Sequence, residues 1–155
     1  MIIDFHTHAF PEKIAARTLD VLRRGSLAVS GIDCVPATDG TPKGLVRQLD
    51  QAGVDMAVVL PIATKPEQTE TINRVAAETY TQSKGRLISF GSVHPADSAA
   101  PDAVDRAAEA GIKGLKLHPE FQGVDINSAC SIAVLRRAAK NKMPVVIHAG
   151  NDIGL

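Results

Sequence analysis

Short apolar runs rich in β-branched residues alternate along the chain with segments of helical periodicity, and this alternation limits the folds available to the sequence. Strands are predicted at 2–5, 54–60, 87–93, 112–117 and 145–148. Helices are predicted at 11–24, 42–52, 66–83, 101–110 and 128–141. Alternating strands and helices form βαβ units, in which right-handed crossovers pack the helices over a parallel sheet. An α/β fold is therefore expected.

The spacing of the predicted strands favours one α/β architecture. Strand starts lie roughly 36 residues apart, close to the ~31 residues per unit of a (β/α)₈ TIM barrel. The chain is therefore predicted to be one domain, 1–155, that contains about the first five βα units and lacks strands six to eight. Segment 26–41 has no clear period and is predicted to be a long loop. An open, doubly wound five-stranded domain fits the same count and is an alternative.

Composition and patterning bear on the partners of the chain. Its 17 basic and 17 acidic residues cancel, aromatic residues make up 3%, and Trp is absent, so no nucleic-acid partner is expected. No apolar run approaches the ~20 residues that cross a bilayer, and the N-terminus lacks a signal-peptide pattern. No membrane contact and a cytoplasmic location are expected. Cys34 and Cys130 are predicted to be reduced thiols, with a single disulfide as the alternative.

Two histidines at the end of the first predicted strand give the sharpest chemical signal. Residues i and i+2 of a strand point to the same face, so the imidazoles of His6 and His8 can converge on one divalent cation. They lie at the carboxyl end of the strand, where barrel enzymes place their catalytic groups. Two exposed or hydrogen-bonded histidines without a metal are the alternative, because a short motif often occurs by chance.

The other three histidines also follow predicted strands. His148 ends the run at 145–148 and can reach the same rim as His6 and His8, which makes it the third candidate metal ligand. His94 and His118 each precede a proline and could orient substrate, transfer protons or support a ligand. A buried structural histidine is the alternative for each of the three.

Charged residues near these histidines extend the candidate site. Lys116 shares a strand face with His118, while the leucines on either side of Lys116 face the opposite way. A lysine facing a barrel interior needs a charge partner, a substrate carboxylate, or carbamylation into a metal-bridging ligand. Asp4 is expected on the face of His6, where it could accept a hydrogen bond from an imidazole N–H. Surface solvation is the simpler interpretation for the remaining acidic candidates, Asp55, Glu120 and Asp152.

Four segments of the chain resemble the amidohydrolase superfamily, and specifically its amidohydrolase 2 group, which is related to aromatic-acid decarboxylases. The segments are MIIDFHTHAFP, LVRQLDQAGVDMAVVLP, GIKGLKLHPEFQG and MPVVIHAG, and together they span nearly the whole chain in the expected order. The resemblance implies a TIM barrel with a divalent metal, commonly zinc, held by His6, His8 and His148. It also implies a histidine after the sixth strand and an aspartate after the eighth, for which this chain has no matching segment.

The resemblance implies an enzyme acting on a small carboxylic acid or amide. In a metal-dependent hydrolase, metal-activated water would attack the carbonyl of an amide, lactone or ester. In a decarboxylase of a small aromatic or unsaturated acid, the metal would help to bind substrate while a carbon is protonated. Lys116 and His118 would act as catalytic and substrate-binding residues in either case, with His94 as a further substrate-binding candidate.

Two other interpretations compete with the amidohydrolase one. TatD-like nucleases and PHP-like phosphoesterases share the opening HxH, but the TatD type typically carries a glutamate where this chain has Lys116. An interpretation of a different class is a truncated, non-catalytic α/β domain. Its open sheet edge at the fifth strand could pair with another chain, so a homo-oligomer is a further expectation.

Overall fold

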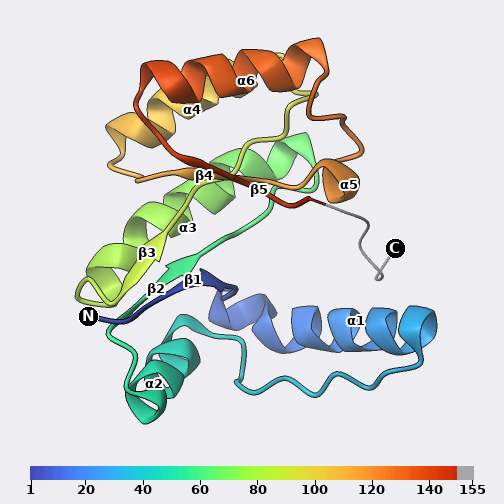
Figure 1. The fold of residues 1–155 in the computed structure, drawn as a ribbon, viewed down its shortest axis with the longest axis vertical. Helices are drawn as coiled ribbons and strands as arrows, with labels where there is room; N and C mark the ends of the chain where they lie inside the picture. The colour runs from blue at the N-terminus through green and yellow to red at the C-terminus, as the bar shows by residue number, and fades with distance from the viewer. Residues whose placement is uncertain (150–155) are drawn as a thin grey trace.

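Strands and helices alternate through residues 1–149, the part of the chain that the computed structural model describes (Figure 1). Its elements are β1 (Ile3–Thr7), α1 (Glu12–Ser30), α2 (Pro42–Ala52), β2 (Met56–Val59), the 3₁₀ helix η1 (Pro66–Gln68), α3 (Thr69–Gln82), β3 (Leu87–Ser89), α4 (Ala100–Glu109), β4 (Leu115–Leu117), α5 (Pro119–Gln122), α6 (Ala129–Lys140) and β5 (Val145–Ile147).

The strands pair in parallel and in the order in which they occur along the chain. β1, β2 and β3 form one sheet, and β4 and β5 form a second. A single bridge between Gly91 and Leu115 joins the two sheets, where Gly91 N–H donates to Gly114 O at 2.9 Å and Lys116 N–H donates to Gly91 O at 2.8 Å. This junction is called the seam below. A doubly wound sheet reverses its strand order, whereas a barrel does not. The TIM-barrel prediction is confirmed, although the five described strands form no closed barrel.

The seam requires glycine on both of its sides. A Cβ at Gly114 would lie 2.4 Å from a ring carbon of Phe90, and a Cβ at Gly91 would lie 2.6 Å from Asn73 Oδ1. Both distances are far below van der Waals contact. Glycine at these two positions therefore leaves the room that the side chains of Phe90 and Asn73 occupy beside the seam.

The two faces of the sheets have different coverings. The outer face packs against helices, with Leu115 and Leu117 of β4 buried against α3, α4 and α6 and Ala57 and Val59 of β2 buried against α2. In Figure 1, α4 and α6 lie together beyond β4 and β5. The inner face carries a smaller apolar cluster of Val58, Leu60 and Phe90, against which Val146 packs. The alternation predicted around Lys116 is confirmed in β4, because Leu115 and Leu117 face the helices.

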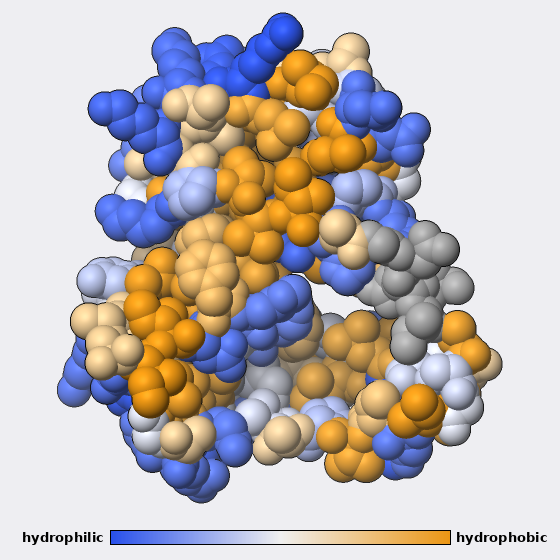
Figure 2. Space-filling view, in the orientation of Figure 1, coloured by the Kyte–Doolittle hydropathy of each residue, from blue (hydrophilic) through white to orange (hydrophobic). Residues whose placement is uncertain are grey.

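The inner face is only partly covered within the described residues. Ile3 and Phe5 of β1 and Ile147 of β5 remain 45, 55 and 39% exposed. Figure 2 shows apolar side chains gathered over the middle of this view, above a hollow that separates them from α1. The surface that would face the centre of a barrel is therefore accessible along this part of the chain.

Helix α1 is longer than predicted. The predicted helix ends at residue 24, before Gly25, but the helix continues to Ser30. It is capped by Gly31, whose φ of 69° is left-handed and whose N–H donates to Leu27 O. Glycine inside a helix costs only about 1 kcal/mol relative to alanine, so Gly25 does not stop it. The predicted loop at 26–41 is wrong over residues 26–30, and the connection begins at Gly31. Ala15 is the one buried residue of α1, which extends sideways in Figure 1 while α2 covers the sheet.

The other predicted strands and helices are present, most of them with shorter bounds. The strand predicted at 87–93 is regular only over Leu87–Ser89, and the helix predicted at 66–83 begins as the 3₁₀ turn η1. The short helix α5 was not predicted. Cys34 and Cys130 are free thiols, as expected. Among the helices of residues 1–149, none is both long and apolar enough to span a membrane.

Candidate metal and substrate site

Most of the predicted site residues lie at one rim of the sheets. His6 is in the last part of β1, His8 follows that strand, and Lys116 is the middle residue of β4, with His118 just after it. His148 follows β5, and its N–H donates to Leu117 O at 3.0 Å. Since the strands are parallel, their carboxyl ends meet at this rim, as barrel enzymes require.

His8 is the residue that the other charged groups surround. Although His8 keeps exposed surface, desolvation lowers its pKa most strongly, and the nearby charges of His6, Lys116 and His118 lower it further. Its Nδ1 lies 3.0 Å from the carbonyl oxygen of Leu60. A carbonyl partner requires Nδ1 to carry the proton, which leaves Nε2 as a lone-pair donor for a metal ion.

A bulge in β1 places Asp4 on the face opposite to His6, so the prediction that the two share a face is wrong. Asp4 pairs with Ala57 and Thr7 pairs with Val59, so one extra residue lies between them on β1. Asp4 therefore shares the outer face with Thr7, and His6 and His8 point to the inner face. Simple i, i+2 alternation fails here, and the Asp4 carboxylate accepts the main-chain N–H of His6 at 3.1 Å.

The rings of His118 and His148 form a second pair beside the first. The His6 and His8 rings have centroids 5.2 Å apart, edge to face. His118 is buried and stacks on His148 at 4.0 Å, with 9° between the planes. The His118 ring also stacks on Phe121, with ring centroids 4.1 Å apart and 12° between the planes. Two histidine pairs, one from β1 and one from the ends of β4 and β5, therefore line the rim.

Lys116 lies at the inner face of β4, and residues 1–149 offer its amine no hydrogen-bond partner. Its side chain is 1% exposed, and Nζ makes no hydrogen bond within the described part of the chain. Desolvation lowers its pKa. Buried amines are usually paired, so this one points to an anionic or polar group that binds beside it.

His94 differs from the other four histidines. It is buried five residues beyond β3, its Nδ1 accepts the N–H of Ala96 at 3.3 Å, and its own N–H donates to Thr69 Oγ1 at 3.4 Å. These contacts hold it to its own loop and to α3. Of the weaker candidates, Asp55 binds the Ile2 N–H at the opposite end of the strands, Glu120 lies in α5, and Asp152 lies outside the described residues.

The predicted metal ligands fit a divalent ion only in part. Within residues 1–149, no three His, Cys, Asp or Glu side chains are close enough together to hold one ion. The available imidazole Nε2 of His8, with His6 beside it, provides nitrogen ligands of the kind that zinc and manganese accept. The amine of Lys116, which has no hydrogen-bond partner in the described part of the chain, provides the charge that an anionic ligand at the same rim would need.

Two buried polar side chains that the sequence did not predict, Ser92 and Gln122, form hydrogen bonds between neighbouring strand ends at the rim. Ser92 Oγ accepts the Ala63 N–H at 3.0 Å and donates to Lys116 O at 2.9 Å. Gln122 donates from Nε2 to the carbonyls of Ala63 and Val93. Ser and Gln carry no distinctive sequence signal, although Gln122 lies in the GIKGLKLHPEFQG segment.

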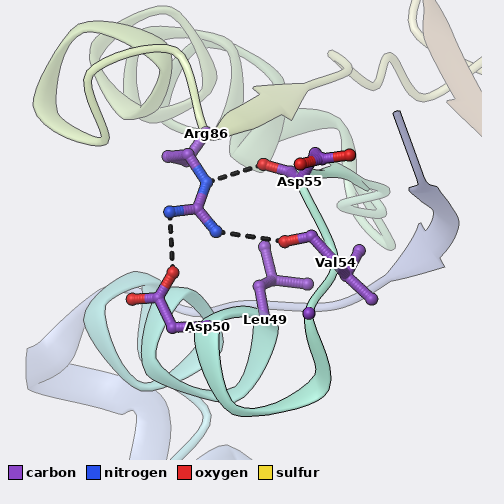
Figure 3. A pocket seen from close by; sticks show the side chains of 6 residues that line it. Leu49, Asp50, Val54, Asp55 and Arg86 are labelled. Atoms are coloured by element: carbon purple, nitrogen blue, oxygen red, sulfur yellow. Dashed lines mark hydrogen bonds and ion pairs between the residues drawn. The ribbon is translucent and has the colours of Figure 1, made fainter.

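Two cavities of the described residues lie away from this rim. One, of about 420 Å³, opens at the amino ends of β2 and β3, where Arg86 bonds Asp50 and the carbonyls of Val54 and Asp55 (Figure 3). The other, of about 360 Å³, is a groove between α3 and α4. The guanidinium in Figure 3 already bonds its neighbours, and it links α2 to the segment that precedes β2.

Comparison with protein families identifies the chain. A family model described as amidohydrolase matches residues 3–154. The chain belongs to the amidohydrolase family. This match favours the amidohydrolase interpretation over the TatD-like and PHP-like ones. No curated protein sequence matches the chain.

Several solved structures share the fold of this amidohydrolase. 5-Carboxyvanillate decarboxylase from Novosphingobium aromaticivorans, solved with manganese, has 18% identity and a TM-score of 0.70 over 96% of this chain and 50% of its own. A probable 2-pyrone-4,6-dicarboxylic acid hydrolase from Acinetobacter baumannii has 19% identity and a TM-score of 0.58 over 96% and 49%. 2,6-Dihydroxybenzoate decarboxylase has 14% identity and a TM-score of 0.66 over 97% and 51%. The chain thus spans about half the length of these structures, and the likeness shows the fold.

Proposed function

We propose that this chain provides the metal-binding and substrate-binding rim of a metal-dependent hydrolase or decarboxylase that acts on a small carboxylic acid or amide. The observation that carries the proposal is the grouping of Lys116 and His118 with His6 and His8 at the carboxyl ends of the strands. The family match supports an enzyme, and related folds are named as decarboxylases and as a dicarboxylic acid hydrolase.

In this proposal His6 and His8 hold a divalent ion together with His148, whose ring would have to move from its stack on His118 toward them, since the three are not grouped within residues 1–149. Zinc is the first candidate ion, and manganese, present in one related structure, is the second. A bound divalent ion would supply Lewis acidity, which polarises a carbonyl or lowers the pKa of water. The Leu60 carbonyl keeps His8 in the tautomer that a ligand needs.

Lys116 and His118 act on the substrate in this proposal. The Lys116 ammonium attracts a substrate carboxylate into a desolvated position, where an ion pair is stronger than in water. His118 holds or moves a proton at the reacting carbonyl or carbon. His94 is kept as a candidate for orienting the substrate, although the contacts of its ring are with its own loop.

Metal content tests the ligand assignment directly. The purified chain is loaded with zinc or manganese, dialysed, and analysed for bound metal beside its mass in solution, which also gives its oligomeric state. About one ion per chain is expected, and the double variant His6→Ala/His8→Ala is expected to lose it. His94→Ala serves as the matched histidine control and should keep it. Full metal content in the double variant would refute the assignment.

The reaction type is tested with a panel of aromatic carboxylates, dicarboxylate lactones and amides. Release of CO₂ would assign decarboxylation, and a new carboxylic acid with uptake of water would assign hydrolysis. Loss of turnover in Lys116→Met for carboxylates, with neutral amides less affected, is the pattern expected if the ammonium binds the substrate carboxylate. Equal losses for both classes would contradict that role.

A further inference from the structure

A single buried amide in α5 connects three neighbouring strands at the rim. The Gln122 side chain is 5% exposed, and its Nε2 donates to the carbonyls of Ala63 and Val93, both at 2.9 Å. Its Oε1 accepts the main-chain N–H of His118 at 3.0 Å. Ala63, Val93 and His118 belong to the segments that leave β2, β3 and β4. One side chain therefore fixes the position of His118 relative to the ends of the two preceding strands.

The same short helix determines how the His118 ring is turned. His118 is the N-cap of α5, and its Nδ1 accepts the N–H of Phe121 at 3.3 Å. The ring lies between Phe121 and His148, stacked on both. Because Nδ1 accepts a hydrogen bond, the neutral ring carries its proton on Nε2. The turn of α5 thus selects one tautomer and one ring plane.

We infer that Gln122 is the positioning residue of this site, holding α5 against the ends of β2 and β3 and so fixing the ring plane and the Nε2-protonated tautomer of His118. The inference deepens the proposed function and rests on it for its chemical meaning, because His118 is the residue that handles a proton there. The three hydrogen bonds of Gln122 use both donors of its amide and one lone pair of its oxygen. A residue with only an acceptor or only an apolar side chain cannot replace it.

Ser92 provides a control that distinguishes a positioning role of Gln122 from a general contribution to fold stability. It is fully buried, and it bonds the same Ala63 segment and Lys116 O across the neighbouring strands. Its side-chain hydrogen bonds go to Ala63 and Lys116, whereas those of Gln122 go to Ala63, Val93 and His118. A substitution of Ser92 therefore removes a buried polar tie of the same kind without removing the one that reaches His118.

The test uses the variants Gln122→Met and Gln122→Glu, with Ser92→Ala as the matched control, all in the full chain. Gln122→Met removes all three hydrogen bonds. Gln122→Glu keeps an acceptor for the His118 N–H but sets a carboxylate oxygen against the two carbonyls. The ¹⁵N signals of the His118 ring, assigned with a His118→Gln variant, report the tautomer at alkaline pH, and chemical denaturation reports stability. Zinc content is measured alongside.

Both Gln122 variants are expected to shift the tautomer ratio of His118 away from Nε2–H by roughly fivefold, the effect of one neutral hydrogen bond. Ser92→Ala should lose stability while leaving the His118 signals unchanged. The inference is overturned if the His118 signals stay in place in both Gln122 variants, or move as much in Ser92→Ala. If Gln122→Met does not fold, Gln122→Glu and Ser92→Ala still decide. Absence of zinc in the unchanged chain would instead count against the proposed function, since the tautomer is measured without metal.

Discussion

Burial of Lys116 destabilises the fold, because the amine leaves water and gains no hydrogen bond within residues 1–149. Replacement by methionine keeps a similar length and removes the charge. We expect Lys116→Met to raise the free energy of unfolding by about 1–3 kcal/mol near neutral pH. The exposed Lys113, three residues earlier, provides the control, and Lys113→Met should change stability by less than about 0.5 kcal/mol. A clear loss of stability in Lys116→Met would show that the amine is paired in solution.

The same lysine makes stability depend on pH in a defined direction. Desolvation lowers its pKa in the folded chain below the ordinary 10.5, so the unfolded chain binds more protons between the two values. The free energy of unfolding therefore rises with pH in that window. Urea denaturation at neutral pH and near pH 10 should show the stability gap between Lys116→Met and the unchanged chain narrowing. A gap that widens toward high pH would contradict this.

At the scale of elements, the two helices between β1 and β2 contribute unequally to the fold. Leu49 of α2 is 3% exposed in the cluster beneath β2, whereas Leu22 of α1 is 50% exposed. Leu49→Ala should lower the free energy of unfolding by about 2–5 kcal/mol, and Leu22→Ala should change it by less than about 0.5 kcal/mol. Denaturant melts of the two variants make the comparison. Equal losses would mean that α1 packs against the described chain more closely than its exposure indicates.

The order and type of the elements were predictable because the spacing of apolar residues differs between a strand and a helix that bury one face. The sequence placed the five strands in order, and with them the rim where four of the five histidines lie. The strand order that excludes a doubly wound sheet could not be read from periodicity, because both folds use the same βαβ units. It needed the bridge at Gly91 and Leu115.

Three features escaped prediction for local physical reasons. The bulge in β1 changes the side of Asp4 through one extra residue, and alternation rules assume that none is inserted. The predicted helix ends before Gly25, although the left-handed turn at Gly31 decides where α1 ends. Gln122 acts through three long-range hydrogen bonds, and no local pattern marks their partners.

At the scale of the whole molecule, the proposed metal would link the two sheets. His6 and His8 belong to the sheet of β1 to β3, and His148 follows the sheet of β4 and β5. Zinc at 100 times its Kd should therefore stabilise the folded chain by about 2.7 kcal/mol. Thermal melts with zinc and with a chelator measure the shift, which His6→Ala/His8→Ala should abolish. An equal zinc shift in that variant would place the bound ion elsewhere.

The two glycines of the seam also restrict how this sequence can diverge. Exposed loops exchange residues with little consequence, but at positions 91 and 114 every other amino acid brings at least a Cβ, which would displace Asn73 or Phe90. The seam separates the strands that carry His6 and His8 from those that carry Lys116 and His118. A substitution there would change the spacing across the site without altering any residue that lines it. Selection for a working site would thus be expected to act on two positions that have no side chain and never meet a substrate.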